Sequence, residues 1–320
     1  MPHEHIASLF DHFQRASAID LGESITIPSD EPTSTNTPIW TTLLSGAVAG
    51  GISRTMTAPL DRLKIILQTQ RSSHFTLIQL VKNIYSEGGW RAFFRGNGTN
   101  VIKICPETAI KFLAYERFKK FFCQDQSHPR TRERLLAGGL AGVTSQLVIY
   151  PLEIAKTRLA LAPKKYYNGI VDCLYNLKKK EGVKSLYKGL TVSIMGIIPY
   201  ASIDLTVYNS LRDAYTNKIY KEPTSSALLA CGAISSICGQ TISYPLVVIR
   251  TRLQAVGIPG IEAKYEGIID CVRKIRKYEG IRGFYRGLVP NFLKSVPAIS
   301  ISYVVFEKCR GALTGVSGVE

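Results

Sequence analysis

The chain has 320 residues, 45% of them hydrophobic, and its 40 Lys and Arg outnumber 24 Asp and Glu to give a net charge of +16. The apolar content excludes a disordered chain, and the charge indicates a nucleic acid, an anionic membrane surface or a small anion as partner. Seven cysteines are scattered without CxxC or metal-ligand spacing, so the sequence predicts neither a disulfide framework nor a metal centre.

Six apolar segments of helical length follow one another along the chain. Four are interrupted by a charge, at Arg54, Lys103, Asp204 and Lys294, whereas residues 135–152 and 223–249 contain none. The run at 223–249 is long enough to span a bilayer, and the run at 135–152 is only just long enough. Taken singly, the four interrupted segments would be read as helices of a soluble protein.

An internal repeat links these segments into three pairs. A string that begins with Pro and ends with a base, here called the Pro-acid-base string, occurs at 59–64 (PLDRLK), 151–156 (PLEIAK) and 245–250 (PLVVIR), and its third residue is an acid in the first two copies. An aromatic-base-Gly string follows each, at 93–96 (FFRG), 186–189 (LYKG) and 284–287 (FYRG). Three copies with two helical segments each predict six helices. Because these helices are apolar all round except for one charged stripe, we expect membrane spans rather than the amphipathic helices of a soluble repeat protein.

The connections within the repeats are much more basic than the other loops. Residues 71–95, 163–188 and 257–286 contain 18 Lys and Arg, whereas residues 1–40, 120–134 and 213–224 contain 7. The positive-inside rule therefore places the three connections on one side of the membrane and both termini on the other. Short amphipathic runs at 170–180 and 268–278 are expected to lie along the membrane surface.

The pattern P-x-[D/E]-x-x-[K/R], followed by [D/E]-G, four or five residues and aromatic-[K/R]-G, recurs three times between residues 38 and 313, with Val247 in place of the acid in the third copy. This repeated pattern resembles the mitochondrial carrier family. The resemblance implies an all-α membrane protein, in which six transmembrane helices in three pseudo-symmetric repeats form a barrel with short matrix-side amphipathic helices. It also implies a monomeric transporter of the mitochondrial inner membrane, not an enzyme, that works by alternating access. The chain then divides into an N-terminal extension and three carrier repeats, at residues 1–37, 38–125, 126–222 and 223–320.

Within the family, the sequence is similar to the ATP-Mg/phosphate carriers, the short calcium-binding branch. The likeness is carried by residues 95–112 (RGNGTNVIKICPETAIKF), 196–208 (GIIPYASIDLTVY) and 291–307 (NFLKSVPAISISYVVFE). It implies exchange of ATP-Mg or ADP for phosphate, with Mg²⁺ entering only as part of the nucleotide. The sequence contains no D-x-[DN]-x-[DN]-G calcium loop, so we expect calcium-independent transport.

The Pro-acid-base strings predict a gate on the matrix side. Proline kinks a membrane helix, and an acid and a base three residues apart lie on one helical face. The family implies that each acid pairs with the base of the next odd-numbered helix. The expected pairs are Asp61–Lys156 and Glu153–Arg250. A local pair within one helix is the alternative interpretation, but it would not explain the threefold repetition.

Two details modify this matrix gate. Gln68 and Gln254 would brace the ion pairs. In the third copy Val247 replaces the acid, so Lys64 has no acidic partner on the fifth helix.

A second ring of charges, with the pattern [F/Y]-[D/E]-x-x-[K/R], stands near the ends of the even-numbered helices. The family pattern makes these residues a cytoplasmic gate, formed by Glu116, Lys119, Arg212, Glu307 and Arg310. The expected pairs are Glu116–Arg212 and Glu307–Lys119. Ordinary snorkelling of charges at helix ends is the competing interpretation.

Charged residues at the middle of the predicted spans indicate a substrate site between the gates. Lys103, Glu107 and Lys111 lie at i, i+4 and i+8 and form one stripe on an apolar helix. A charge at this depth costs about 2.5–3.5 kcal/mol, so it must face water or a partner, and converging cations suit phosphate oxygens. With the positions that match the family's contact points, the candidate site comprises Arg54, Lys103, Glu107, Gly196, Ile197 and Lys294. Gly196 and Ile197 would accept a flat adenine.

The aromatic-base-Gly turns place backbone N–H groups at helix N-termini, which suit anions. Together with Tyr167-x-Gly169 and Tyr265-x-Gly267, they resemble the family's cardiolipin sites.

Three other functions fit parts of the sequence. An ADP/ATP or coenzyme A carrier is the alternative within the class, although RTRLQA at 250–255 stands in place of the RRRMMM string of ADP/ATP carriers. A carrier that leaks protons is also compatible with the residues. A basic nucleic-acid-binding protein belongs to another class, and the uncharged run at 223–249 argues against it, so no nucleic acid is expected as a partner.

Overall fold

The computed structural model describes residues 39–70, 77–122, 131–163, 166–219, 225–261 and 265–314, and within them the only regular secondary structure is helical. The long helices are α2 (Ile39–Thr69), α6 (Ile104–Phe122), α7 (Thr131–Leu161), α9 (Leu190–Ile219), α10 (Ser225–Ala255) and α12 (Leu288–Thr314). The shorter ones are α3 (Leu77–Gly88), α4 (Trp90–Phe93), α5 (Asn97–Ile102), α8 (Ile170–Glu181), η1 (Val183–Tyr187), α11 (Ile268–Tyr278) and η2 (Ile281–Tyr285).

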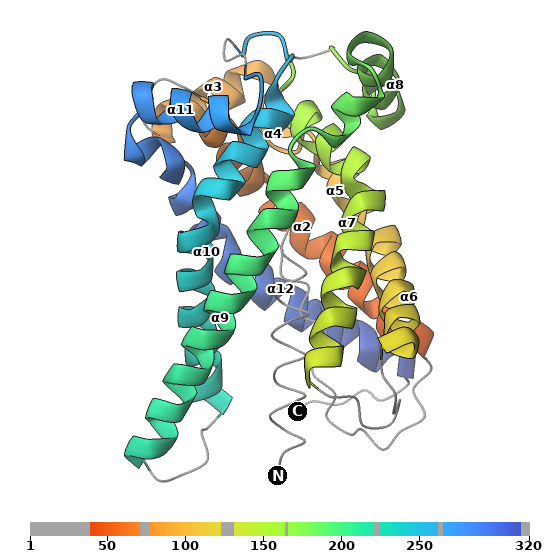
Figure 1. The fold of residues 1–320 in the computed structure, drawn as a ribbon. Helices are drawn as coiled ribbons and strands as arrows, with labels where there is room; N and C mark the ends of the chain where they lie inside the picture. The colour runs from red at the N-terminus through yellow and green to blue at the C-terminus, as the bar shows by residue number, and fades with distance from the viewer. Residues whose placement is uncertain are drawn as a thin grey trace.

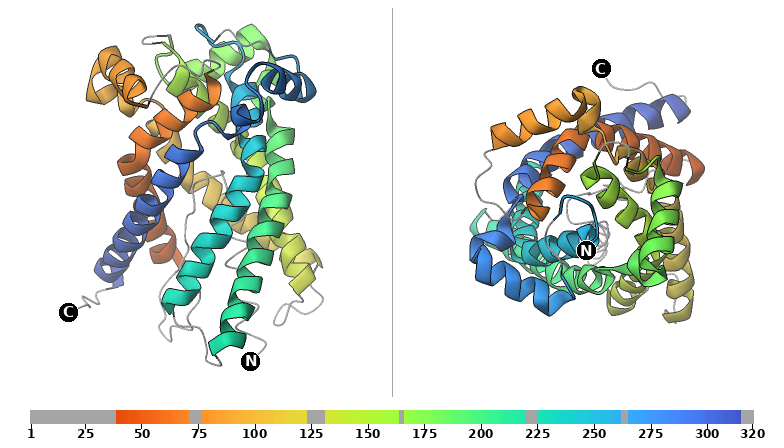
Figure 2. Two further views of the ribbon diagram at one scale, coloured as in Figure 1. Left: turned by 90° about the vertical axis from the view of Figure 1, so that its left-hand side faces the viewer. Right: turned by 90° about the horizontal axis from the view of Figure 1, so that it is seen from above.

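The long helices form a ring around a central axis, which the view from above in Figure 2 shows. The most extensive contacts join α2 to α12, α6 to α7 and α9 to α10, and each of these pairs unites helices from different sequence repeats. Because the last helix packs against the first, the ring is closed.

The short helices α3, α8 and α11 lie across one end of the ring, at the top of Figure 1. Each is amphipathic: α8, for example, buries Cys173 and Leu177 and leaves Val171 81% exposed, while α11 leaves Ile269 74% exposed. A membrane interface would cover such exposed apolar side chains. The two amphipathic runs expected from the sequence are thus helices, α8 and α11.

Hydropathy alone marks only part of the bundle as membrane-spanning. Among the described residues, three helical stretches are long and apolar enough to cross a membrane: Val183–Thr216, Ala230–Ala255 and Ile281–Leu313. Charge lowers the hydropathy of the others, since α2, which is 31 residues long, contains Asp61, Arg62 and Lys64. All three of these side chains are buried within the protein.

The aromatic-base-Gly turns join each repeat to the next. Gly96 has a positive φ of 85°, and a Cβ atom there would lie 2.9 Å from the carbonyl oxygen of Lys156, the gate base of the following repeat. The equivalent contacts are Gly189 with the Arg250 carbonyl and Gly287 with the Lys64 carbonyl, at 3.3 and 3.1 Å. Only glycine combines this backbone conformation with so close an approach. The turns therefore hold together α2, α7 and α10, which carry the Pro-acid-base strings and are called the proline helices below.

We expect Gly96→Ala to be more destabilising than Gly182→Ala. Both glycines have positive φ, 85° and 82°, but nothing lies within 4 Å of a Cβ placed on Gly182. The close approach at Gly96 should therefore lower the free energy of unfolding by about 1–3 kcal/mol beyond the cost of the backbone conformation alone. Thermal melting of the purified variants measures the difference, and equal losses would show that the inter-repeat contact is not tight.

Candidate functional site

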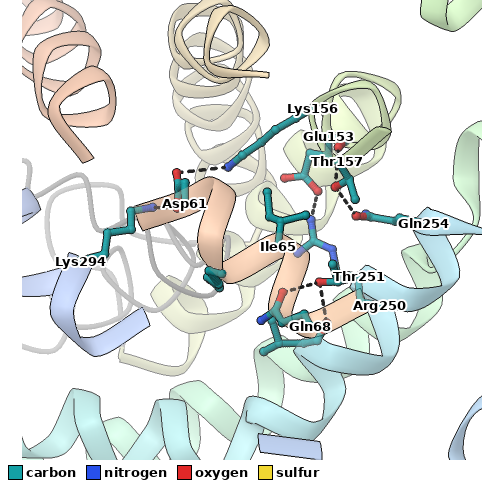
Figure 3. Close-up of a pocket in the computed structure, with 12 residues that line it drawn as sticks. Asp61, Ile65, Gln68, Glu153, Lys156, Thr157, Arg250, Thr251, Gln254 and Lys294 are labelled. Carbon is teal, nitrogen blue, oxygen red and sulfur yellow. Dashed lines mark hydrogen bonds and ion pairs between the residues drawn. The ribbon is translucent and has the colours of Figure 1, made fainter. Parts of the chain in front are cut away.

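A cavity lies among α2, α7 and α10, the three helices that carry the Pro-acid-base strings (Figure 3). These helices contact one another. The cavity contains about 500 Å³ of empty space, part of it open to solvent. Its lining residues are Asp61, Lys64, Ile65, Gln68, Glu153, Lys156, Thr157, Val247, Arg250, Thr251, Gln254 and Lys294. Four of these side chains are basic and two are acidic, so the lining carries an excess of positive charge that favours an anion.

Asp61 is the first of the two acids, and it holds bases from two different helices. Its carboxylate is 3.9 Å from Nζ of Lys156 on α7, the partner expected from the repeat, and 2.6 Å from Nζ of Lys294 on α12. The side-chain amide of Asn100 also donates to it, at 3.4 Å. Lys294, which is predicted to bind substrate, and Lys156, which is predicted to form the matrix gate, therefore share the carboxylate of Asp61.

Glu153 repeats this arrangement on α7. It forms the expected ion pair with Arg250 on α10 and a second pair with Lys103, whose Nζ is 3.4 Å from Oε1. Gln146 donates to Oε2 of the same carboxylate, at 2.8 Å. Lys103 is fully buried and Lys294 is 2% exposed, so these carboxylates offset much of the cost of holding the two lysines away from water.

The two glutamines join the proline helices through hydroxyl groups. Gln68 on α2 donates to the hydroxyl of Tyr244 at 3.0 Å and accepts from Thr251 at 3.0 Å, both on α10. Gln254 on α10 makes the same contacts with Tyr150 and Thr157 on α7, at 3.1 and 2.8 Å. The glutamines thus link the helices that they were expected to brace, and tyrosine and threonine side chains are the partners that sequence reasoning missed.

The third contact between proline helices, α2 with α7, lacks this hydrogen-bonded set. Ala58 occupies the position of the tyrosines and Ala160 that of the glutamines, and both are buried. A second cavity lies there, and its lining includes both alanines together with Asp61 and Lys156. Around the cavity, the α2–α7 contact therefore has an ion pair without a glutamine, whereas Val247 leaves the α10–α2 contact with a glutamine but without an acid.

Three buried arginines form a further set of ties that the sequence did not reveal. Each binds the acid of the [D/E]-G string in its own repeat and a backbone carbonyl of the next one. The sets are Arg62 with Glu87 and Ala160, Arg158 with Glu181 and Val256, and Arg252 with Glu279 and Gln68. The recurrent acid was visible in the motif. Arg158 and Arg252 both stand seven residues after their proline, but Arg62 stands three residues after its own, so the three arginines do not form one repeated pattern.

These ion pairs, and burial around them, shift the pKa values of groups outside the predicted spans. Burial acts to raise the pKa of Glu181, but the hydrogen bonds and charges of Arg158 and Lys188 outweigh it, and the pKa lies below the ordinary value. Its contribution to stability is therefore present at neutral pH and is lost as the pH falls through that lowered value. Burial raises the pKa of Cys173 to about 11 and that of Cys271 to about 12, so both stay protonated thiols.

The remaining candidate residues are more dispersed. Arg54 is buried on α2 and donates to the backbone oxygen of Asn100 at 2.8 Å. Gly196 and Ile197 lie on α9 and are not among the residues that line the cavity of Figure 3. Glu107 on α6 contacts Lys103, with its Oε2 4.0 Å from Nζ of the lysine.

The cytoplasmic gate stays a prediction. Glu116 and Lys119 lie on α6, and Arg212 lies on α9. In Figure 1 the lower ends of these two helices, far from α8, are separated from each other. Glu307 and Arg310 lie on α12, but their side chains are outside the part of the structure that is described.

The family model described as "Mitochondrial carrier protein" matches the chain three times, at residues 35–126, 127–219 and 221–317. The chain therefore belongs to the mitochondrial carrier family, whose members are transporters rather than enzymes.

Individual carrier proteins are also similar to the chain over nearly its whole length. The chain is 45% identical to the mitochondrial adenyl nucleotide antiporter SLC25A24 of Danio rerio and 44% identical to that of Homo sapiens, over 98% of this chain and 67% of each relative. It is also 44% identical to the calcium-binding mitochondrial carrier protein SCaMC-2-A of Danio rerio, over 98% of this chain and 68% of the relative. The chain thus spans about two thirds of the length of these proteins.

An acid at position 247 should strengthen the α10–α2 contact. Val247 and Lys64 both line the cavity, so Val247→Asp places a carboxylate opposite α2 where the other repeats have one. We expect a coupling of about 1–3 kcal/mol between Asp at 247 and Lys64 and a slower exchange rate, because each transport cycle must separate the helices.

A double-mutant cycle with Lys64→Ala tests this expectation through melting temperature and exchange rate, at equal amounts of protein in the membrane. Without Lys64 the new carboxylate loses its partner and should lower stability instead. The same effect of Val247→Asp with and without Lys64 would rule out the pairing across α10 and α2.

Proposed function

We propose that the protein exchanges adenine nucleotides, as ATP-Mg or ADP, for phosphate across the mitochondrial inner membrane. The observation that carries this proposal is the pairing of both gate acids with a substrate-site lysine, Asp61 with Lys294 and Glu153 with Lys103. The SLC25A24 relatives, which are mitochondrial adenyl nucleotide antiporters, support the same conclusion.

In the proposed mechanism the substrate competes with the gate for its lysines. Phosphate oxygens form strong charge-assisted hydrogen bonds with Lys103 and Lys294 and draw them away from Glu153 and Asp61. The two carboxylates then hold the gate less firmly, and α2, α7 and α10 can separate. Binding energy is thereby used to open the gate, as a population shift requires.

The same network explains why transport would be an exchange. If an empty carrier opened its gate, lysines and carboxylates would separate without new partners, and unpaired charge in a low-dielectric interior is strongly unfavourable. A bound anion removes this penalty. Only the carrier with a bound substrate would change readily between its two open states. Each substrate carried outward must therefore be followed by a substrate carried inward.

The membrane arrangement completes the proposal. We place three carrier repeats of two spans each in the bilayer, with the charges of α2, α6 and α7 facing the interior or a water-filled path. The basic connections and their helices α3, α8 and α11 would face the matrix. Gly196 and Ile197 would contact adenine, and the cytoplasmic gate would be closed whenever the matrix gate is open. The aromatic-base-Gly turns would bind cardiolipin on a monomeric carrier.

Lys103→Ala and Lys294→Ala should each abolish most exchange while the protein stays folded in the membrane. Glu153 retains Arg250 and Gln146 when Lys103 is removed, and Asp61 retains Lys156 and Asn100 when Lys294 is removed. Uptake of labelled nucleotide into phosphate-loaded proteoliposomes measures the effect. Lys274→Ala, at a 39% exposed side chain on α11, is the control and should leave uptake unchanged. Near-normal uptake by either site variant would reject this site.

Exchange by the 320-residue chain should be the same with a chelator and with micromolar free calcium. The chain contains no calcium-binding loop of the EF-hand type. The measurement is ATP-Mg uptake at fixed magnesium in the two conditions. A several-fold activation by calcium would reveal a regulatory site within the carrier itself.

A further inference from the structure

Glu107 is an acid in a site that is otherwise suited to anions. It lies one helical turn from Lys103 on α6, and its Oε2 is 4.0 Å from the Nζ of that lysine. The same oxygen is buried and has no hydrogen-bond partner among the described residues. Ser145 contacts Glu107, but it donates to the backbone oxygen and not to the carboxylate.

The gate does not account for this carboxylate. Lys103 is already 3.4 Å from Glu153, which also holds Arg250 and accepts from Gln146. Glu107 is farther from Lys103 than Glu153 is, and its 4.0 Å contact is long for a hydrogen bond. A buried carboxylate oxygen without a donor is unfavourable unless a ligand satisfies it.

A polyphosphate that carries no cation would add electrostatic repulsion at this site. Lys103 attracts phosphate oxygens, but Glu107, one turn away, would repel them at close range. A divalent cation reverses the sign of this interaction. Mg²⁺ in proteins is commonly held by one or two carboxylates together with the phosphates of a substrate.

We propose that Glu107 binds the divalent cation that a nucleotide carries on its phosphates, while Lys103 binds the phosphate oxygens beside it. Glu107 would then set the preference of the carrier for the magnesium complex of ATP over magnesium-free nucleotide. This inference rests on the proposed exchange of nucleotide for phosphate and adds to it the residue that recognises the cation.

A structural role for Glu107 makes a different prediction. If the carboxylate only orients Lys103, its loss should weaken the binding of every phosphate-bearing substrate to the same extent. If it binds the cation, its loss should weaken only the magnesium complex. The ratio between two substrates therefore separates the roles, whereas a single transport rate does not.

The experiment uses the full chain in proteoliposomes loaded with phosphate. Labelled ATP is supplied with excess magnesium, and labelled ADP is supplied with EDTA, to the wild type and to Glu107→Gln, Glu107→Asp and Lys103→Ala. We expect Glu107→Gln to lower the ratio of ATP-Mg uptake to ADP uptake at least about tenfold, the usual scale for a metal site that loses a supporting group. Glu107→Asp keeps the carboxylate and should recover part of the ratio, and Lys103→Ala should lower both rates together.

An unchanged ratio in Glu107→Gln would overturn the inference, whether neither uptake falls or both fall by the same factor. If the variant transports too slowly to measure, the rise in melting temperature on adding ATP-Mg, compared with ATP and EDTA, gives the same ratio from binding. Failure of the proposed function can be told apart from failure of this inference, because the wild type would then exchange neither nucleotide for phosphate. That result would remove this inference as well.

Discussion

The structure depends on the need to neutralise charge inside a helical ring. Asp61 and Glu153 meet this need with two bases each. One base comes from the next proline helix, and the other is Lys294 on α12 for Asp61 and Lys103, between α5 and α6, for Glu153. Isolated charges in such an interior would be unfavourable by several kcal/mol, and the pairs offset that cost only while they hold. In the mechanism proposed above, the same contacts stabilise the closed arrangement and allow it to open, because a substrate that binds the lysines would loosen the gate.

Sequence reasoning found the parts of this network that repeat. The acid and base of each string recur at fixed spacing, so Asp61 could be assigned to Lys156 from the pattern of the family. The pairing of Lys294 with Asp61 could not be found in this way, because it joins the first and last helices at a depth that only the packed ring defines. Arg62 was missed for another reason, since it reaches the acid of its repeat from a different position in the string.

The three contacts between proline helices are not equivalent. Ion pair and hydrogen-bonded glutamine occur together only between α7 and α10, where Glu153 meets Arg250 and Gln254 meets Tyr150. The other two contacts have one component each, and α2 takes part in both. Three sequence repeats thus coexist with unequal contacts between their helices, because a single difference such as Val247 leaves one contact without an acid.

The glycine turns have a consequence for how the ring forms. Gly96 fits against the backbone of Lys156, and the equivalent turns repeat this fit until the third repeat reaches the first. In an open array of repeats the terminal units have a free edge and can fray independently. A closed ring has no such edge, so loss of any one repeat exposes the docking surfaces of both neighbours. We therefore expect the three repeats to fold cooperatively, since a single repeat expressed alone would lack the surfaces that complete its own core.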